Sequence, residues 1–216
     1  YGTQNLNPIL IVSYRNIKSN MVYYRQHKSY AIPKGSRTMK TVYILLTRSN
    51  TIMSRMVRLF TRAHYTHASL SLSLSDALFY SFGRKNISRP LPAGFVREPL
   101  AAGFFGAHPE TECALLALPV EDDVYVMIER RLSNMERIAG IYRYNLLGAL
   151  FCYFGVARSR KRYYFCSQFV GDVLDRSGAA VLPKPSSLMH PMDYAGLDNM
   201  EIVYTGNIAQ LLQTVR

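Results

Sequence analysis

The pattern of hydrophobic and polar positions in the first part of the chain predicts mainly short strands. A continuous β-branched and aromatic run at 40–47, KTVYILLT, is typical of a buried strand. Residues 49–63 begin with a capping Ser or Asn and then place apolar side chains on one helical face, which predicts a helix. Alternation predicts two more strands at 66–73 and 78–84, joined by a short polar turn.

Longer helical patterns follow. Residues 85–110 are rich in Pro and Gly and predict a long irregular excursion, the kind of loop that acts as a lid or a substrate wall. A strand is expected at 111–120 and an amphipathic helix, with acids in its first turn, at 121–138. The other expected elements are a buried apolar helix at 144–157, a helix at 162–178 with Gly178 as C-cap and with Asp172 and Asp175 on its exposed face, a Pro-rich stretch at 183–191, a strand at 201–206 and a final helix at 207–215. Hairpins with segregated helices predict an α+β fold with an antiparallel sheet packed against helices.

The charge of the chain changes this picture little. A net charge of +12 usually suggests a nucleic-acid or anionic-membrane partner. However, residues 1–38 contain six Lys or Arg and no Asp or Glu, so half of the excess lies in one segment. A second basic cluster at 158–162 is expected to be a solvated loop, with a patch for an anionic substrate or membrane as the alternative. We expect no specific nucleic-acid partner and leave open a peripheral contact with an anionic membrane.

Composition also predicts a domain boundary at Met39. The preceding residues, YAIPKGSRT, carry the Pro, Gly and Ser punctuation of a linker, and a strand pattern follows at once. Residues 1–38 are therefore interpreted as a basic N-terminal extension or linker outside the core. Residues 39–216 form one domain, which is long enough to bury a substantial core.

Targeting signals and metal motifs are not expected in this sequence. The longest apolar runs fall short of the ~18–20 residues that span a bilayer, and NPILIV is too short for a signal-peptide core. Three widely spaced cysteines, Cys113, Cys152 and Cys166, form neither a C-x-x-C pair nor a Cys/His zinc pattern. His64 and His67 straddle a helix end and a strand start, which disfavours a shared metal. These features predict a cytoplasmic protein without metal or cofactor.

The residues with chemical potential are Cys166 and His67. Cys166 is expected one or two residues inside the start of a helix, where the helix dipole and free N–H groups favour the thiolate. The same N–H groups can hold an oxyanion during acyl transfer. Such a nucleophile needs an imidazole that a third polar group orients, and His67 at the start of a core strand is the best-placed candidate. Taken alone, either residue is more often structural.

Together these local contexts resemble a known family. The stretches YTHASLSL and LFYSFGR, followed much later by FCSQFVGDVL, resemble the circularly permuted branch of the papain-like NlpC superfamily. That branch includes the YiiX-like hydrolases and the lecithin:retinol acyltransferase group, and bacterial members with a YSFGRK hairpin are the most similar. In this branch the His strand precedes the Cys helix, as here. The resemblance covers about residues 39–205 and implies a circularly permuted papain-like fold.

The resemblance also implies roles for individual residues. Cys166 would be the nucleophile and His67 the general base. The third position falls on Ser81, where relatives hold His, Glu, Asp or Asn, and a neutral hydroxyl orients imidazole less strongly than a carboxylate. Its neighbour Tyr80 is a possible substitute. Gln168 is assigned a supporting role, against the alternative that it faces solvent.

The function expected from these residues is that of a cysteine-dependent hydrolase or acyltransferase. It would cleave an amide, ester or thioester, and a peptide-like amide is favoured over a lipid acyl ester at a membrane surface. Because Ser81 is neutral, a non-catalytic binding module of the same fold remains the alternative.

Overall fold

The computed structural model describes residues 38–48, 64–86 and 91–215. The chain separates into two units, Tyr1–Gly35 and Ser36–Arg216, and every described residue belongs to the second. The fold below is therefore that of the second unit.

Two predictions fall outside the described residues. One is the helix expected at 49–63. The other is the basic extension at 1–38, of which only Thr38 is described. Both stay predictions, as does the domain boundary at Met39.

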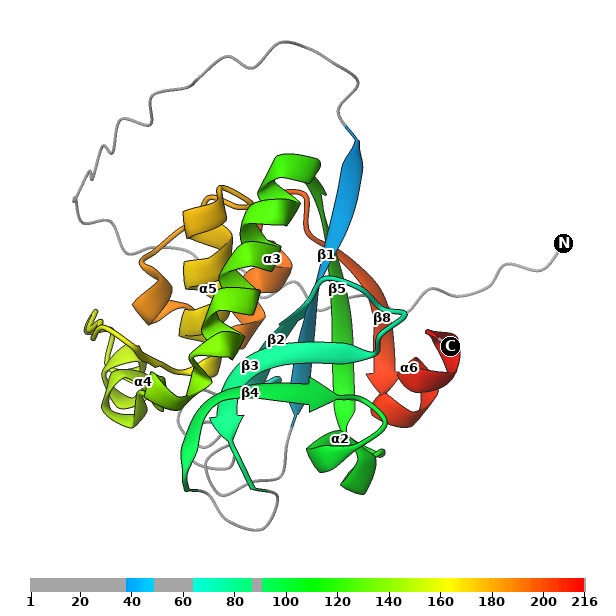
Figure 1. The fold of residues 1–216 in the computed structure, drawn as a ribbon, viewed down its shortest axis with the longest axis horizontal. Coiled ribbons are helices and arrows are strands. Elements are labelled where there is room, and N and C mark those ends of the chain that lie inside the picture. Colours follow the sequence, from blue (N-terminus) through cyan, green and yellow to red (C-terminus); the bar gives the residue numbers. More distant parts are fainter. Residues whose placement is uncertain (1–37, 49–63, 87–90, 216) are drawn as a thin grey trace, which may run out of the picture. The chain divides into compact units, whose positions relative to one another are not determined.

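A six-stranded sheet forms the centre of the unit (Figure 1). Its strands are β1 (Met39–Arg48), β2 (His67–Ser71), β3 (Leu78–Arg84), β4 (Ala93–Pro99), β5 (Glu112–Glu121) and β8 (Glu201–Asn207). Their order in the sheet is β4-β3-β2-β1-β5-β8, and each neighbouring pair is antiparallel. The prediction of an α+β fold with an antiparallel sheet is confirmed.

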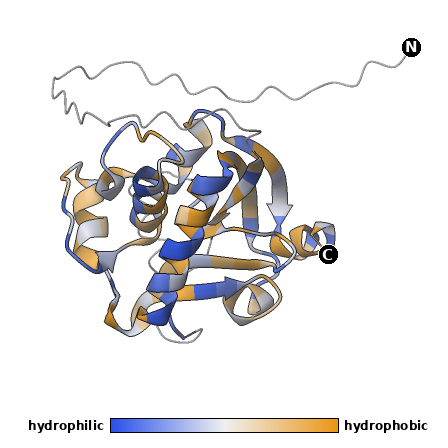
Figure 2. Cartoon of the chain, turned by 45° about the horizontal axis from the view of Figure 1, so that its top comes forward, coloured by the Kyte–Doolittle hydropathy of each residue, from blue (hydrophilic) through white to orange (hydrophobic). Residues whose placement is uncertain are grey.

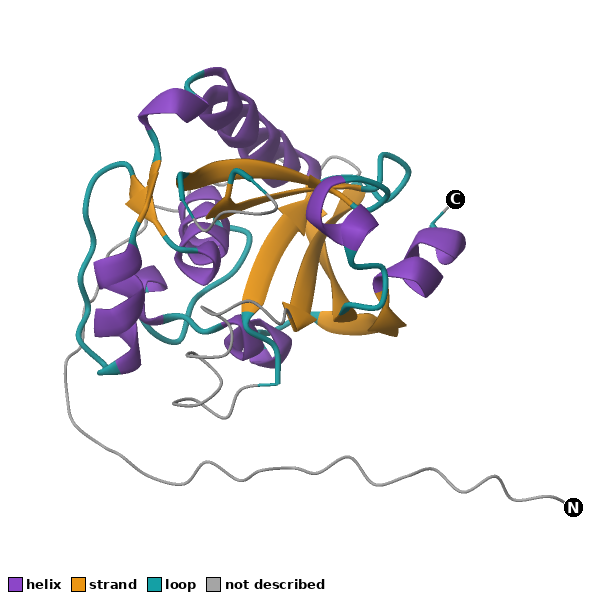
Figure 3. Cartoon of the chain, turned by 90° about the horizontal axis from the view of Figure 1, so that it is seen from below, coloured by secondary structure: helices purple, strands orange, loops and turns teal. Residues whose placement is uncertain are grey.

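Helices flank this sheet on both sides (Figure 3). They are α2 (Gly103–Ala107), α3 (Asp122–Arg137), α4 (Leu146–Tyr153), α5 (Cys166–Ser177) and α6 (Ile208–Thr214), with short 3-10 turns at Ala139–Ile141, Ser186–Leu188 and Pro191–Gly196. Two short parallel strands, β6 (Arg143–Tyr144) and β7 (Tyr163–Tyr164), bracket α4. Within the described ranges, no helix has the length and apolar content to cross a membrane.

Alternating side chains of the strands build a separate core on each face of the sheet. Ile44 of β1 lies in the larger core, together with Ile128 of α3 and Phe169 of α5. The adjacent Leu45 points to the opposite face and packs in a smaller core with Phe105 of α2. Because successive strand residues face opposite sides, one apolar run such as 40–47 supplies both cores.

The expectation of an irregular excursion at 85–110 is wrong. This stretch contains β4, which pairs with β3 along its whole length, and the short helix α2. Phe95 of β4 is buried in the larger core, where it packs against Phe82 and Phe169. Pro92 and Pro99 flank or end β4, whereas Gly94 lies within it, and pairing with a neighbouring strand outweighs the low strand propensity of these residues.

The expectation of a buried apolar helix at 144–157 is also wrong, because the helix is shorter and largely exposed. Its helical part, α4, is only eight residues long, and it leaves most of its large side chains on the surface. Leu147 is 68% exposed and Leu150 50% exposed, whereas Gly148 and Cys152 are the buried residues. An apolar composition alone does not say which neighbours exist to cover a helix.

The helix predicted at 162–178 corresponds to α5, which begins later, at Cys166, and ends at Ser177. Cys166 is its first residue, and Gly178 adopts the left-handed conformation at φ 75° that suits a glycine C-cap. Asp172, expected on the exposed face, is instead buried. Its carboxylate pairs with Arg131 of α3 and, at 2.7 Å, with Nε of Arg176. The helix is therefore covered on more sides than its apolar stripe indicates.

Candidate active site

Cys166 lies where α5 meets the start of β2. Only 7% of the residue is exposed, and burial by itself raises the pKa of a thiol. The hydrogen bond and charge of His67 and the backbone N–H groups of Ala68 and Ser167 act in the opposite direction. Together they outweigh burial, so the pKa of Cys166 lies below its ordinary value. The first residue of a helix also has no intrahelical partner for its own N–H.

His67 is the first residue of β2, and its backbone pairs with Thr47 of β1. Its ring Nε2 lies 2.9 Å and 3.0 Å from the two carboxylate oxygens of Glu98. The Cys166 thiol is a second neighbour of the ring and interacts with it electrostatically. Burial lowers the pKa of His67, but the charge of Glu98 and the hydrogen bonds with Cys166 and Glu98 raise it well above its ordinary value. These two shifts favour a protonated ring beside an ionised thiol.

Glu98, which sequence reasoning did not select, is the partner of the imidazole. It lies on β4, next to the last residue of that strand, and its side chain is 16% exposed against 18% for His67. Glu98 was missed because residues 85–110 were expected to form an irregular loop, and the position of a carboxylate on such a loop relative to the His strand is not predictable from sequence. The available signal was the adjacent strand-forming pair Phe95 and Val96, on a strand two places from that of the histidine.

Gly83 gives the carboxylate its path to the imidazole. A Cβ at Gly83 would lie 3.5 Å from Oε1 of Glu98 and 3.9 Å from Cε1 of His67. The two groups therefore meet over a residue without a side chain. An alanine would fit at ordinary contact distance, but a longer side chain would enter the space in which the two groups meet.

Ser81, expected to be the third residue, has another role. It is completely buried, and its hydroxyl donates a 2.7 Å hydrogen bond to the carbonyl of Ala68. A hydroxyl has one proton to donate, and this one joins β3 to β2 directly after His67. The orienting role predicted for Ser81 is therefore corrected in favour of Glu98.

The two expected supporting residues, Gln168 and Tyr80, interact with groups other than the imidazole. Gln168 is 1% exposed, which excludes the alternative that it faces solvent, and its side-chain oxygen accepts a 3.4 Å hydrogen bond from Asn145. Asn145 in turn caps α4 by accepting from the N–H of Gly148. Tyr80 stacks on Phe95, on the face of β3 opposite to Ser81, and burial raises its pKa. Gln168 thus links α5 to α4, and Tyr80 belongs to the larger core.

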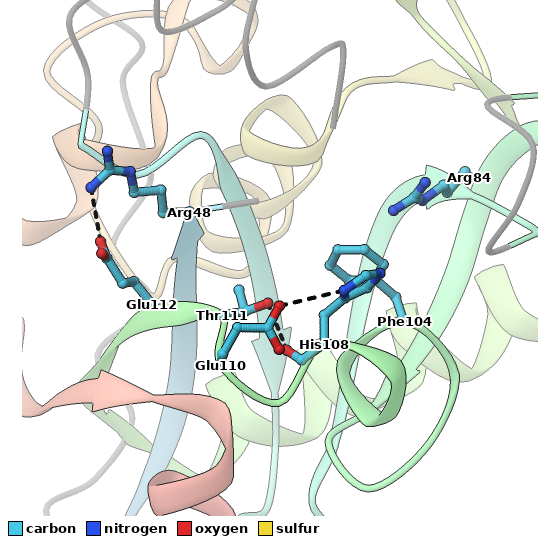
Figure 4. A pocket seen from close by; sticks show the side chains of 7 residues that line it. All are labelled: Arg48, Arg84, Phe104, His108, Glu110, Thr111 and Glu112. Carbon is cyan, nitrogen blue, oxygen red and sulfur yellow. Dashed lines mark hydrogen bonds and ion pairs between the residues drawn. The ribbon is translucent and has the colours of Figure 1, made fainter. Parts of the chain in front are cut away.

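A cavity of about 470 Å³ opens at the end of the sheet where β1 and β3 finish and β5 begins (Figure 4). Its lining consists of Arg48, Arg84, Phe104, His108, Glu110, Thr111 and Glu112. Arg84 directly follows Gly83 and interacts electrostatically with Glu98, but Cys166, His67 and Glu98 are not themselves among the lining residues. Figure 4 shows Arg48 paired with Glu112 and His108 paired with Glu110. The lining is thus mainly charged and polar.

The other cysteines are poor nucleophiles. Burial raises the pKa of Cys113 to about 12. Burial likewise raises the pKa of Cys152 to about 11, although its sulfur lies 4.0 Å from Nε2 of His190. His64, the other half of H-x-x-H, pairs with Glu112 rather than with a group around His67. Among the described residues, no cluster of three or more His, Cys, Asp or Glu side chains could hold a metal ion.

Comparison with known proteins adds no family to this geometry. No model of a protein family matches the sequence, and no curated protein matches it either. The chemistry of the site is therefore inferred from its own atoms.

Proposed function

We propose that the chain is a cysteine-dependent hydrolase or acyltransferase in which Cys166, His67 and Glu98 act together. The observation that carries the proposal is the His67 ring, which pairs with the Glu98 carboxylate at 2.9 Å and interacts electrostatically with the Cys166 thiol. This is the arrangement of nucleophile, base and orienting group that acyl transfer requires. The order of elements along the chain also supports a circularly permuted papain-like fold, because the strand that carries His67, β2, precedes the helix that carries Cys166, α5.

The proposed reaction runs in two balanced steps. The thiolate of Cys166 attacks the carbonyl carbon, and the free N–H of Cys166 holds the resulting oxyanion. The imidazolium of His67 then gives its proton to the leaving amine or alcohol as the bond to the carbonyl carbon breaks. Water or a second acceptor gives a proton back to His67 and displaces the thiolate from the thioester.

The substrate we propose is a peptide-like amide rather than a fatty-acyl ester. The cavity that Arg84 lines has four charged side chains from Arg and Glu and only one phenylalanine in its lining. Such a lining suits polar groups and offers little apolar surface to an acyl chain. The alternative of a non-catalytic module rested on a neutral third residue, and the carboxylate of Glu98 removes that ground.

Labelling with iodoacetamide across a pH series tests the proposed thiol chemistry. Since the pKa of Cys166 is lowered, we expect its labelling to persist well below the ordinary thiol pKa of 9.0. The His67→Ala variant should lose this low-pH reactivity, and Cys166→Ala should lose the fast phase entirely. Cys152→Ala is the matched control, because a thiol with a pKa of about 11 adds little to the fast phase.

Hydrolysis of a panel of peptide-like amides and lipid acyl esters then tests the substrate class. Slow and equal labelling of all three cysteines would contradict the proposed nucleophile. Faster turnover of the lipid esters would contradict the proposed substrate.

A further inference from the structure

The surface around α4 concentrates exposed apolar side chains. Among the described residues, fifteen large hydrophobic side chains are exposed, and eight of them lie between residues 138 and 156. They are Ile138, Ile141, Leu146, Leu147, Leu150, Tyr153, Phe154 and Val156. Exposure is greatest at Leu147, with 68%, and at Phe154, with 66%. Such a concentration on one segment marks an interaction surface rather than scattered surface residues.

Positive charge accompanies this apolar surface. Residues 137–171 contain six Arg or Lys and no Asp or Glu. Four of them, at 158–162, are exposed on the loop that follows α4. The guanidinium of Arg158 lies over the ring of Phe151 at 5.0 Å, so basic and apolar groups share one surface. In Figure 2 the orange helix α4 lies beside the blue segment of this basic loop.

The fold holds this surface firmly although it covers only its inner side. The N–H of Asn145 donates to the carbonyl of Tyr164 at 2.9 Å, and the N–H of Arg143 donates to that of Arg162 at 3.0 Å. These bonds join the two ends of the segment that contains α4 and the basic loop. Gly148 and Cys152 bury the inner side of α4. The outer side is therefore presented in a defined geometry.

We propose that α4 and the basic loop dock on the surface of an anionic lipid bilayer. Apolar side chains gain free energy by entering the boundary between headgroups and acyl chains, and Arg and Lys gain free energy beside anionic headgroups. An uninterrupted positive charge complements such a membrane. Cys166 begins α5 only four positions after Arg162, so docking brings the candidate active site to the membrane surface. The docking does not depend on the thiol chemistry proposed above.

Vesicle flotation of the full-length Cys166→Ala protein tests the docking. We expect binding to phosphatidylcholine vesicles that contain phosphatidylserine, weaker binding without phosphatidylserine, and release by salt. The double variants Leu147→Gln/Phe154→Gln and Arg158→Gln/Lys161→Gln should each lower the partition coefficient about tenfold or more. The first matched control is Ile202→Gln/Val203→Gln, which changes two exposed apolar residues of β8. The second is Lys85→Gln/Arg130→Gln, and both controls should bind like the parent.

Three outcomes overturn the docking. One is equal binding to neutral and anionic vesicles, and another is unchanged binding of both α4-region double variants. The third is self-association that the Leu147→Gln/Phe154→Gln change abolishes, which would assign the surface to a second copy of the chain. Vesicle binding without reactive Cys166 in the parent protein would count against the proposed function and leave the docking intact.

Discussion

At the scale of single residues, the candidate site depends on a charge balance around one imidazole. A thiolate at Cys166, only 7% exposed, would be unfavourable without a positive neighbour. A protonated His67 ring supplies that charge, and the carboxylate of Glu98, 2.9 Å from Nε2, favours the protonated form. Each of the three groups thus depends on the next, so removing the charge of Glu98 should change the reactivity of the Cys166 thiol.

The change Glu98→Gln tests this chain of interactions. The amide can still hydrogen-bond Nε2 but carries no charge, so we expect the pKa of His67 to fall and the reactive thiolate to require a higher pH. The rate of iodoacetamide labelling of Cys166 near neutral pH should drop by roughly tenfold or more. Stopped labelling followed by peptide mass spectrometry measures the rate at each pH.

The control for this experiment is Ser81→Ala. It removes the hydrogen bond to Ala68 and should cost about 1 kcal/mol of stability with little change in the labelling profile. If Ser81→Ala shifted the profile more than Glu98→Gln, the assignment of Glu98 as the orienting group would be wrong.

At the scale of elements, α5 carries the candidate nucleophile Cys166 and is packed firmly against its neighbours. Its apolar residues Phe169, Val170 and Val173 are completely buried in the larger core. Asp172 adds an ion pair with Arg131, which ties α5 to α3. A partly buried carboxylate between two arginines is stabilising only while it stays paired.

The change Asp172→Asn should therefore destabilise the fold. We expect a loss of about 1–3 kcal/mol in the free energy of unfolding, because Arg131 keeps its burial and loses its counter-charge. Urea unfolding followed by circular dichroism gives the measurement. Asp175→Asn, an exposed position on the same helix, should lie within about 0.5 kcal/mol of the parent. Equal effects of the two changes would remove the structural role assigned to Asp172.

At the scale of the whole molecule, the site couples folding to pH. His67 has a raised pKa in the folded chain, so its stabilising contribution is complete below the ordinary value of 6.5 and is lost as the pH rises through the folded pKa. Cys166 has a lowered pKa, so its contribution is present above the ordinary value of 9.0 and is lost as the pH falls through the folded pKa. As the pH rises between the ordinary and the folded pKa of each group, the contribution of His67 to the free energy of unfolding therefore falls and that of Cys166 rises.

Removing the thiol should expose the slope due to His67. We expect the unfolding free energy of Cys166→Ala, relative to Cys166→Ala/His67→Gln, to fall as the pH rises above about 6.5, by up to about 1.4 kcal/mol per pH unit. Urea titrations of both proteins at several pH values give this difference. A difference that grows with pH would mean that Glu98 does not hold the proton on His67.

Much of the fold was predictable because local patterns and tertiary structure agree. The continuous apolar run at 40–47, the alternation after His67 and the apolar stripe of α5 are each a local pattern that suits one kind of element. The strand at 93–99 was not predictable in the same way, because its Pro and Gly residues argue locally for a loop. Pairing with β3 and the burial of Phe95 decide it, and both depend on residues distant in the sequence.

The same division holds for the candidate site. The sequence by itself placed Cys166 at a helix start and His67 at a strand start, since capping, dipole and alternation act within a few residues. Only the tertiary structure decided that the third member is Glu98 and not Ser81. The hydroxyl of Ser81 is committed to a neighbouring carbonyl, while the carboxylate crosses the open space over Gly83 to reach the ring. Side-chain reach across adjacent strands is a property of the assembled sheet, and no local pattern encodes it.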